Sequence, residues 1–343
     1  MIHAKTLSRL VMLVIAAFVV LQWNPTLASA QDEDTLKKAK AEGALVFYTS
    51  AGITEMKPLV DGFAKKYAFI KVDFYRGISE KLLSKILTEE RAQTHRFDVV
   101  LTNTLELDDL IARGIIAKYK SPERNAFSER DMDKEGYWTN VQSSYYVLGY
   151  NTKLVPAASA PKDWPDVLSP QWKQSFAMDR EEDNWYGAML EYLGPEAGGR
   201  FMRRLASMDP VFHRGHTLIA QLLAAGEFSL AIVYPHRVEA MKKQGAPIEW
   251  VTTIKPIIAE MGPIGIAAKA SHPNSAKVFV DYILSHEGQQ LLRDAGRIVP
   301  RRDVPPLTAS FEATKLELFP LSGNVLRRRN ELAQEFSEIF KTR

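Results

Sequence analysis

Three arginines stand close behind the ends of predicted strands. Arg76, Arg214 and Arg237 each carry a planar guanidinium, whose fork of N–H donors binds a carboxylate or a phosphate at two points. Parallel sheets bind their ligands at the carboxyl ends of the strands, so this placement predicts that the arginines surround a small anion. The alternative for any one of them is a solvated surface charge, which is the usual state of an arginine.

Small polar residues lie between the same predicted strands and the helices that follow them. Ser50, Ser79 and Thr104 hold such positions in the first half of the chain. Backbone N–H groups at a helix start attract anions, so these positions predict further donors to the same ligand. The alternative is that the side chains only cap their helices. The residues predicted to bind a ligand are Tyr48, Ser50, Arg76, Ser79, Asn103, Thr104, Arg214, His216, Thr217, Tyr234 and Arg237.

The elements that must position these residues alternate along the first part of the chain. The runs Leu45–Thr49, Ile70–Phe74 and Asp98–Leu101 predict short strands, and apolar residues at helical spacing follow each of them. Alternation of strand and helix indicates an α/β fold, in which helices cover both faces of a mainly parallel sheet.

The run Val141–Tyr150 is too long and too rich in strand formers for an ordinary connection. It predicts a strand that crosses into a second lobe, and the helical spacing of apolar residues in Ser275–Leu292 predicts a return to the first. The basic tail predicts an amphipathic helix docked on a lobe. The expected organisation is a signal peptide at 1–30, lobe one at 31–140, lobe two at 141–253, and a return to lobe one with C-terminal helices at 254–343.

The first thirty residues have the pattern of a cleaved secretory signal. Lys5 and Arg9 precede the apolar run Leu10–Leu21, and Ala28–Ala30 supplies a small-x-small cleavage site. The run is shorter than the roughly 20 residues of a membrane-spanning helix, which argues against the alternative of an anchor. The chain has no cysteine, so no disulfide framework holds the exported protein together. Its 44 basic and 41 acidic residues nearly balance, which gives no support for nucleic-acid binding.

Several segments resemble extracellular solute-binding proteins of bacterial ABC importers, in the cluster that binds ferric iron, thiamine or sugar phosphates. They are Ala39–Ser50, Phe97–Val100, Gly149–Thr152, Pro161–Trp164 and Gly226–Ile232. The resemblance implies the type 2 periplasmic binding protein fold, in which hinge-connected α/β lobes close on a ligand. It implies a periplasmic, monomeric, substrate-binding component that delivers its ligand to a permease in the inner membrane. Together with the arginines, it predicts a small anionic solute: an organic phosphate, phosphonate or carboxylate. Glu260 and Met261, on the returning segment, are further candidates for the cleft.

Ferric iron is the alternative ligand, and the sequence departs from the pattern of iron-binding relatives. Those relatives usually hold iron with adjacent tyrosines, whereas here Pro235 follows Tyr234. Tyr145 and Tyr146 are adjacent, but in a strand they would point to opposite faces. Ferric iron demands anionic oxygen ligands, so the sequence predicts neither a metal nor any other cofactor.

A secreted hydrolase is the alternative of a different class. The chain lacks a Gly-x-Ser-x-Gly elbow and a His-Glu-x-x-His motif, and it has no thiol nucleophile. Ser50, His216 and Asp179 have no spacing that indicates a triad. The sequence therefore predicts no catalytic residue and no enzymatic activity.

Overall fold

The computed structural model describes residues 33–312 and 315–342 of the 343-residue chain. The predicted signal peptide at 1–30 lies outside the described residues. Within the described part of the chain, no helix combines the length and the apolar character needed to cross a membrane.

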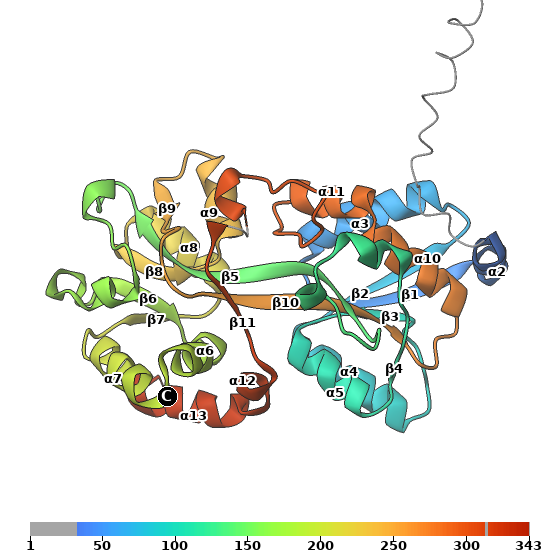
Figure 1. The fold of residues 1–343 in the computed structure, drawn as a ribbon, viewed down its shortest axis with the longest axis horizontal. Coiled ribbons are helices and arrows are strands. Elements are labelled where there is room, and N and C mark those ends of the chain that lie inside the picture. Colours follow the sequence, from blue (N-terminus) through green and yellow to red (C-terminus); the bar gives the residue numbers. More distant parts are fainter. Residues whose placement is uncertain (1–32, 313–314, 343) are drawn as a thin grey trace, which may run out of the picture.

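Two lobes lie side by side, each with helices on both sides of its strands (Figure 1). Lobe one contains β1 (Ala44–Thr49), β2 (Lys71–Arg76), β3 (Val99–Leu101), β4 (Ile116–Ala117), α2 (Glu33–Glu42), α3 (Ile53–Lys66), α4 (Ser79–Arg91), α5 (Thr104–Ala112), α10 (Pro273–Leu284) and α11 (His286–Asp294). Lobe two contains β6 (Phe176–Asp179), β7 (Val211–His213), β8 (Leu230–Val233), β9 (Ile248–Trp250), α6 (Asp183–Leu193), α7 (Pro195–Ala206), α8 (His216–Ala225) and α9 (Pro235–Lys242). The predicted α/β class is confirmed.

Two long antiparallel strands connect the lobes. They are β5 (Thr139–Asn151) and β10 (Ile257–Ala267), and Tyr146 of β5 pairs with Ile258 of β10. The far end of β5 pairs with β8 of lobe two, while β10 pairs with β3 of lobe one. Strand order along the sheet is β2-β1-β3-β10-β5-β8-β6-β7. The long run that the sequence predicts as a crossing strand is therefore confirmed as β5.

The chain ends with β11 (Leu318–Pro320), α12 (Gly323–Arg327) and α13 (Arg329–Phe340). β11 pairs with β10, and α13 lies along the lower side of lobe two in Figure 1. Leu332, Phe336 and Phe340 of α13 are buried in the core of lobe two. The predicted amphipathic helix is confirmed, and the lobe that it covers is lobe two rather than lobe one.

Short 3₁₀ turns fill several connections: Pro122–Ala126, Glu129–Asp131, Ala157–Ser159, Trp164–Leu168, Pro170–Trp172 and Ala309–Phe311. The predicted helical segment 275–292 is two helices, because Ser285 leaves the helical conformation and its hydroxyl accepts a hydrogen bond from the Gly288 amide at the start of α11.

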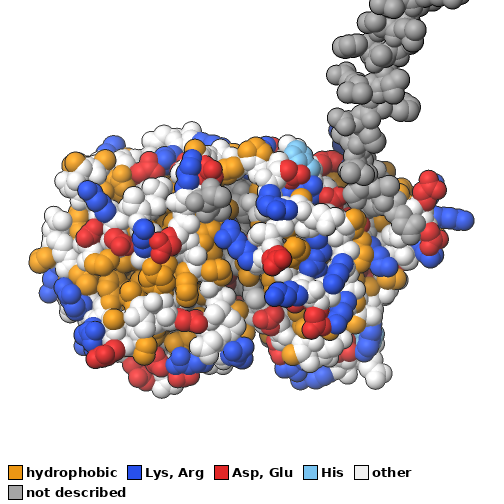
Figure 2. Space-filling view, in the orientation of Figure 1, with side chains coloured by type: hydrophobic (Ala, Val, Ile, Leu, Met, Phe, Trp, Pro, Cys, Tyr) orange, Lys and Arg blue, Asp and Glu red, His pale blue; other side chains and the backbone are white. Residues whose placement is uncertain are grey.

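Each lobe has its own apolar core. In lobe one, the ring of Phe279 packs edge-on against the rings of Phe47 and Phe63, with centroids 4.9 Å apart in each pair. In lobe two, the buried rings of Trp164 and Trp185 are 5.0 Å apart. Edge-to-face and tilted contacts of this kind favour a fixed arrangement of the rings. Figure 2 shows the lobes touching along most of their length, with a notch at the lower edge between them.

Asp98, at the start of β3, is a buried polar link within lobe one. Its carboxylate accepts hydrogen bonds from the Val46 amide at 2.8 Å and the His272 amide at 2.9 Å. Asp98→Ala leaves both donors without this acceptor, and we expect a loss of about 3 kcal/mol of unfolding free energy by urea denaturation. Asp109→Ala removes only an exposed i,i+4 pair with Arg113 and should stay close to wild type. Equal effects of the two substitutions would contradict this role of Asp98.

Candidate functional site

Helix starts from both lobes meet where the lobes face each other. Helices α3, α4 and α5 follow β1, β2 and β3, and α8 and α9 follow β7 and β8. The residue before each of these five helices makes no side-chain capping bond to described residues. Ser79 and Thr104 are the first residues of their helices rather than caps. The capping alternative therefore does not explain them, and the helix starts keep their attraction for an anion.

An aromatic and acidic cluster lies at the lobe-two side of this meeting point. The rings of Tyr234, His216 and Tyr146 pack closely in tilted and edge-on contacts: the centroid of the Tyr234 ring lies 4.1 Å from that of His216 and 5.2 Å from that of Tyr146. The Tyr146 hydroxyl donates to Glu260 Oε2 at 3.2 Å. Glu182 Oε1 lies 3.3 Å from His216 Nε2. The sequence predicted His216, Tyr234 and Glu260 for the cleft, and the structure brings these three together.

Burial controls the protonation of this cluster. It raises the pKa of Tyr146 and of Tyr234 well above the usual value, so both phenols stay protonated. For His216, burial alone would lower the pKa, but the Glu182 carboxylate outweighs it and the pKa is raised. Burial also raises the pKa of Glu260.

A pair of arginines lies beside His236, on which the Tyr234 ring stacks. Arg237 Nη2, at the start of α9, is 3.0 Å from Glu55 Oε1 of α3, so this ion pair joins the two lobes. Arg297 is 7% exposed and donates to Gln142 Oε1 at 2.9 Å. Its Nη1 lies 2.8 Å from His236 Nε2 and 3.9 Å from Glu55 Oε1. Burial, followed by the Arg297 charge, lowers the pKa of His236, which fits a neutral ring that accepts from Arg297.

A third group of charged residues, where α13 meets lobe one, is organised by Arg329. Its Nε donates to Asp183 Oδ2 of α6 and its Nη1 donates to Glu80 Oε1 of α4, both at 2.9 Å. The same Nη1 is 3.6 Å from Glu106 Oε1 of α5. Arg329 begins α13, which packs on lobe two, so its guanidinium holds lobe one against lobe two.

The structure places several predicted residues apart from these groups. Tyr48 lies in the core of lobe one, stacked 5.6 Å from the ring of Phe97, with its hydroxyl bonded to Glu89. Arg214 has a side chain 78% exposed and 3.7 Å from Glu181, and Arg76 is exposed at the end of β2. Ser50, Asn103 and Thr217 remain beside helix starts.

Sequence reasoning missed Arg297 and Arg329. Arg297 follows α11 rather than a strand of either lobe. Arg329 belongs to a run of three arginines in the basic tail, which the sequence predicts only as an amphipathic helix docked on a lobe. No local signal separates either residue from its neighbours. The sequence argues against Tyr145 and Tyr146 as a pair of ligands, because neighbouring residues of a strand point to opposite faces. The same alternation of β5 directs Tyr146 alone toward Glu260.

Other observations limit what the site can hold. Among the described residues, no three His, Cys, Asp or Glu side chains are arranged to hold a metal ion.

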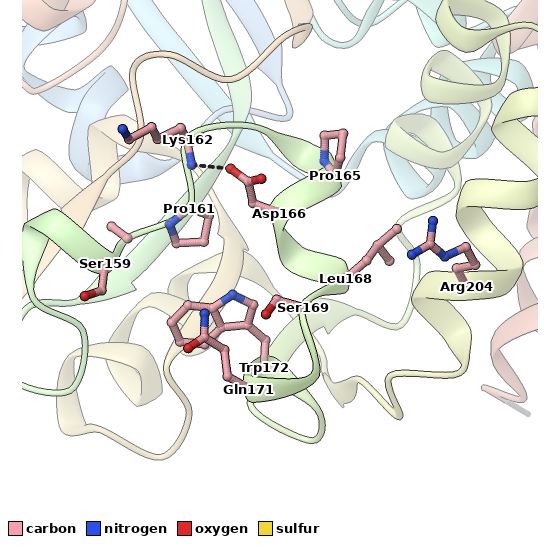
Figure 3. A pocket seen from close by; sticks show the side chains of 11 residues that line it. Ser159, Pro161, Lys162, Pro165, Asp166, Leu168, Ser169, Gln171, Trp172 and Arg204 are labelled. Carbon is pink, nitrogen blue, oxygen red and sulfur yellow. Dashed lines mark hydrogen bonds between the residues drawn. The ribbon is translucent and has the colours of Figure 1, made fainter.

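A surface hollow of ≈ 470 Å³ on lobe two lies between the turns around Trp172 and Arg204 of α7 (Figure 3). It contains none of the residues that join the lobes.

The sequence of residues 58–318 matches the family described as bacterial extracellular solute-binding protein. The chain belongs to this family. As a solute-binding protein, it is also similar to the Fe(3+)-binding periplasmic protein of Serratia marcescens, with 22% identity over 266 residues that cover 74% of this chain and 78% of that protein.

Two solved structures share the fold of this solute-binding protein. Iron-bound HitA from Pseudomonas aeruginosa has a TM-score of 0.75 at 20% identity, covering 86% of this chain and 99% of that chain. AfuA from Actinobacillus pleuropneumoniae, with fructose-6-phosphate bound, has a TM-score of 0.74 at 22% identity, covering 87% and 99%. The predicted type 2 periplasmic binding protein fold is confirmed.

Removing the Arg329 guanidinium should loosen the contact between the lobes. We expect Arg329→Ala to lower the energy transfer between fluorophores on cysteines introduced on the outer faces of α4 and α7, because Asp183 and Glu80 lose their shared partner. Arg328→Ala is the matched control, since Arg328 pairs with Glu331 and Glu335 of its own helix. Equal energy transfer in the two variants would contradict the bridging role.

Glu106 should give the stability a distinct pH dependence. Burial raises its pKa from 4.5 to about 7, so the folded protein keeps a proton that the unfolded chain releases. As the pH rises from 4.5 to about 7, the contribution of Glu106 to the free energy of unfolding therefore falls. We expect urea denaturation to show Glu106→Gln gaining stability relative to wild type from pH 5 to 7 and holding that gain above pH 8. Parallel pH profiles would contradict the raised pKa.

Proposed function

We propose that this protein is the substrate-binding component of an ABC importer and captures a small anionic solute between its lobes. In the periplasm it would carry that solute, chemically unchanged, to a permease in the inner membrane. A monomer suffices for this role, because both halves of the candidate site come from one chain. The observation that carries the proposal is the pair Arg237 and Arg297, held at the interface of two lobes whose helix starts face each other.

The charge balance at this pair favours an anion. Arg237 and Arg297 bring two positive charges, whereas Glu55 is the acid that both of them approach. Nearby lie the starts of α3 and α9, whose first amides add partial positive charge. Arg297 is oriented by Gln142 and Ser144, which leaves Arg237 as the arginine able to exchange Glu55 for a ligand. A carboxylate, phosphate or phosphonate matches these donors.

Ferric iron is the second candidate, because one observation favours it. Tyr146 and Tyr234 have ring centroids 5.2 Å apart, close to the carboxylates of Glu182 and Glu260. Iron would have to displace protons from both phenols, since burial raises their pKa. A ferric complex with tyrosinate ligands is coloured, so the absorption spectrum after addition of ferric citrate separates this candidate from a metal-free anion.

Isothermal titration with organic phosphates, phosphonates and carboxylates tests the proposal. For the anion that binds, Arg237→Ala should weaken the affinity by about 10-fold or more, because a charged and desolvated contact contributes about 1.5–3 kcal/mol. Arg214→Ala is the matched comparison, since it removes an exposed arginine of the same lobe. A loss in Arg214→Ala alone would place the anion beside α8, and the failure of every anion to bind would overturn the proposal.

A further inference from the structure

The region around Arg329, where the lobes meet, carries an excess of negative charge. Arg329 is the guanidinium around which four carboxylates gather, and it contacts three of them directly. The fourth, Glu260, influences the same group through its charge. The carboxylates are Glu80, Glu106, Asp183 and Glu260. Glu80 is exposed to water, but Glu106 and Asp183 are buried. One guanidinium does not neutralise this many carboxylates where two of them are withdrawn from water.

Two buried acceptors around Arg329 lack a hydrogen-bond partner among the described residues. Glu106 is 3% exposed, and its Oε2 finds no hydrogen-bond partner among the described residues. Within the same part of the chain, Asn184 Oδ1 also lacks a partner, while its Nδ2 donates to Glu260 Oε1 at 3.3 Å. A buried acceptor without a donor costs free energy, and a buried carboxylate costs more. The region therefore favours a partner that brings N–H donors and positive charge.

Tyr234 connects the two charged regions. Its ring lies tilted against His216, which is next to Glu182, and stacks on His236, which contacts Arg297, with ring centroids 4.1 and 5.6 Å away respectively. A ligand that contacts Tyr234 therefore has a group of arginines and a group of acids within the same site.

We propose that the solute is dipolar, with its anionic group at Arg237 and Arg297 and an ammonium group at Glu106 and Glu260. This inference rests on the proposed function and specifies the solute class of that same site. An ammonium supplies three donors and one positive charge, which meets the free acceptor on Glu106 and reduces the excess charge around Arg329. A simple anion satisfies the arginines but leaves the acids without their missing donor.

The protonation of Glu106 supports the assignment. The charged groups that face Glu106 are Arg329 from α13, Glu80 from α4 and Glu260 from β10, and burial with these acids raises its pKa to about 7. An ammonium stabilises the carboxylate form, so its binding releases a proton from Glu106. Affinity for a dipolar solute should therefore rise from pH 6 to pH 8.

Matched ligand pairs test the inference. Titration calorimetry at pH 8 compares phosphoethanolamine with ethyl phosphate, 2-aminoethylphosphonate with ethylphosphonate, and β-alanine with propionate. In the pair that binds, we expect the amine to bind at least 10-fold more tightly than the amine-free member. Glu106→Gln should reduce this ratio to about 3-fold or less, because it removes the charge and keeps the shape. Glu181→Gln, an exposed acid of lobe two, should leave the ratio unchanged.

The other results of these titrations would each contradict a specific part of the proposal. Equal affinities within a pair would overturn the dipolar solute and leave the importer proposal standing. A hydroxyl analogue, such as 2-hydroxyethylphosphonate, that binds as tightly as the amine would overturn the ammonium assignment, because a neutral donor would then suffice. If no member of any pair binds, the anionic solute of the proposed function fails, and the dipolar solute fails with it.

Discussion

The pairing of β5 with β10 is the constraint on which the rest of the structure depends. These two strands belong to both lobes at once, since β10 also pairs with β3 and β5 also pairs with β8. Their alternation directs Tyr146 and Glu260 toward the site, where the Tyr146 hydroxyl meets the Glu260 carboxylate. Hinge motion between lobes joined by two strands would leave these side chains in place while the helix starts approach or separate. The floor of the site is thus built by the connection itself, and the walls are built by the lobes.

Ion pairs join the two lobes directly. Arg237 with Glu55, and Arg329 with Glu80, cross from one lobe to the other. Ion pairs of this kind contribute little net stability, because desolvation of the buried partner and solvent screening of the exposed one offset most of the Coulomb attraction. A contact of this kind is therefore suited to opening and to exchanging a protein partner for a charged ligand. The same reasoning accounts for a raised pKa at Glu106, where burial is not fully compensated by Arg329.

The sequence predicted the architecture well because the spacing of apolar residues along the chain indicates whether a segment forms a helix or a strand. Strand and helix alternation gave the α/β class, and the long run Val141–Tyr150 located β5. The site was predicted less completely. Tyr48 is directed by the β1 alternation into the core beside Phe97, so its closeness in sequence to Ser50 was misleading. Arg297 and Arg329 enter the site from segments far along the chain, and only the packing of α11 and α13 brings them there. Contacts between residues so far apart along the chain have no local sequence pattern, so a single sequence does not predict them.

The central claim is that the space between the lobes holds a small organic anion without a metal. Thermal unfolding of the protein in the presence of a ligand panel tests it most directly, because a ligand that binds only the folded state stabilises it by roughly 2.7 kcal/mol at a hundredfold excess over its dissociation constant. The account predicts a rise in the unfolding temperature with an organic phosphate, phosphonate or carboxylate in the presence of a metal chelator. A rise with ferric iron alone, together with the colour of a tyrosinate complex, would contradict it.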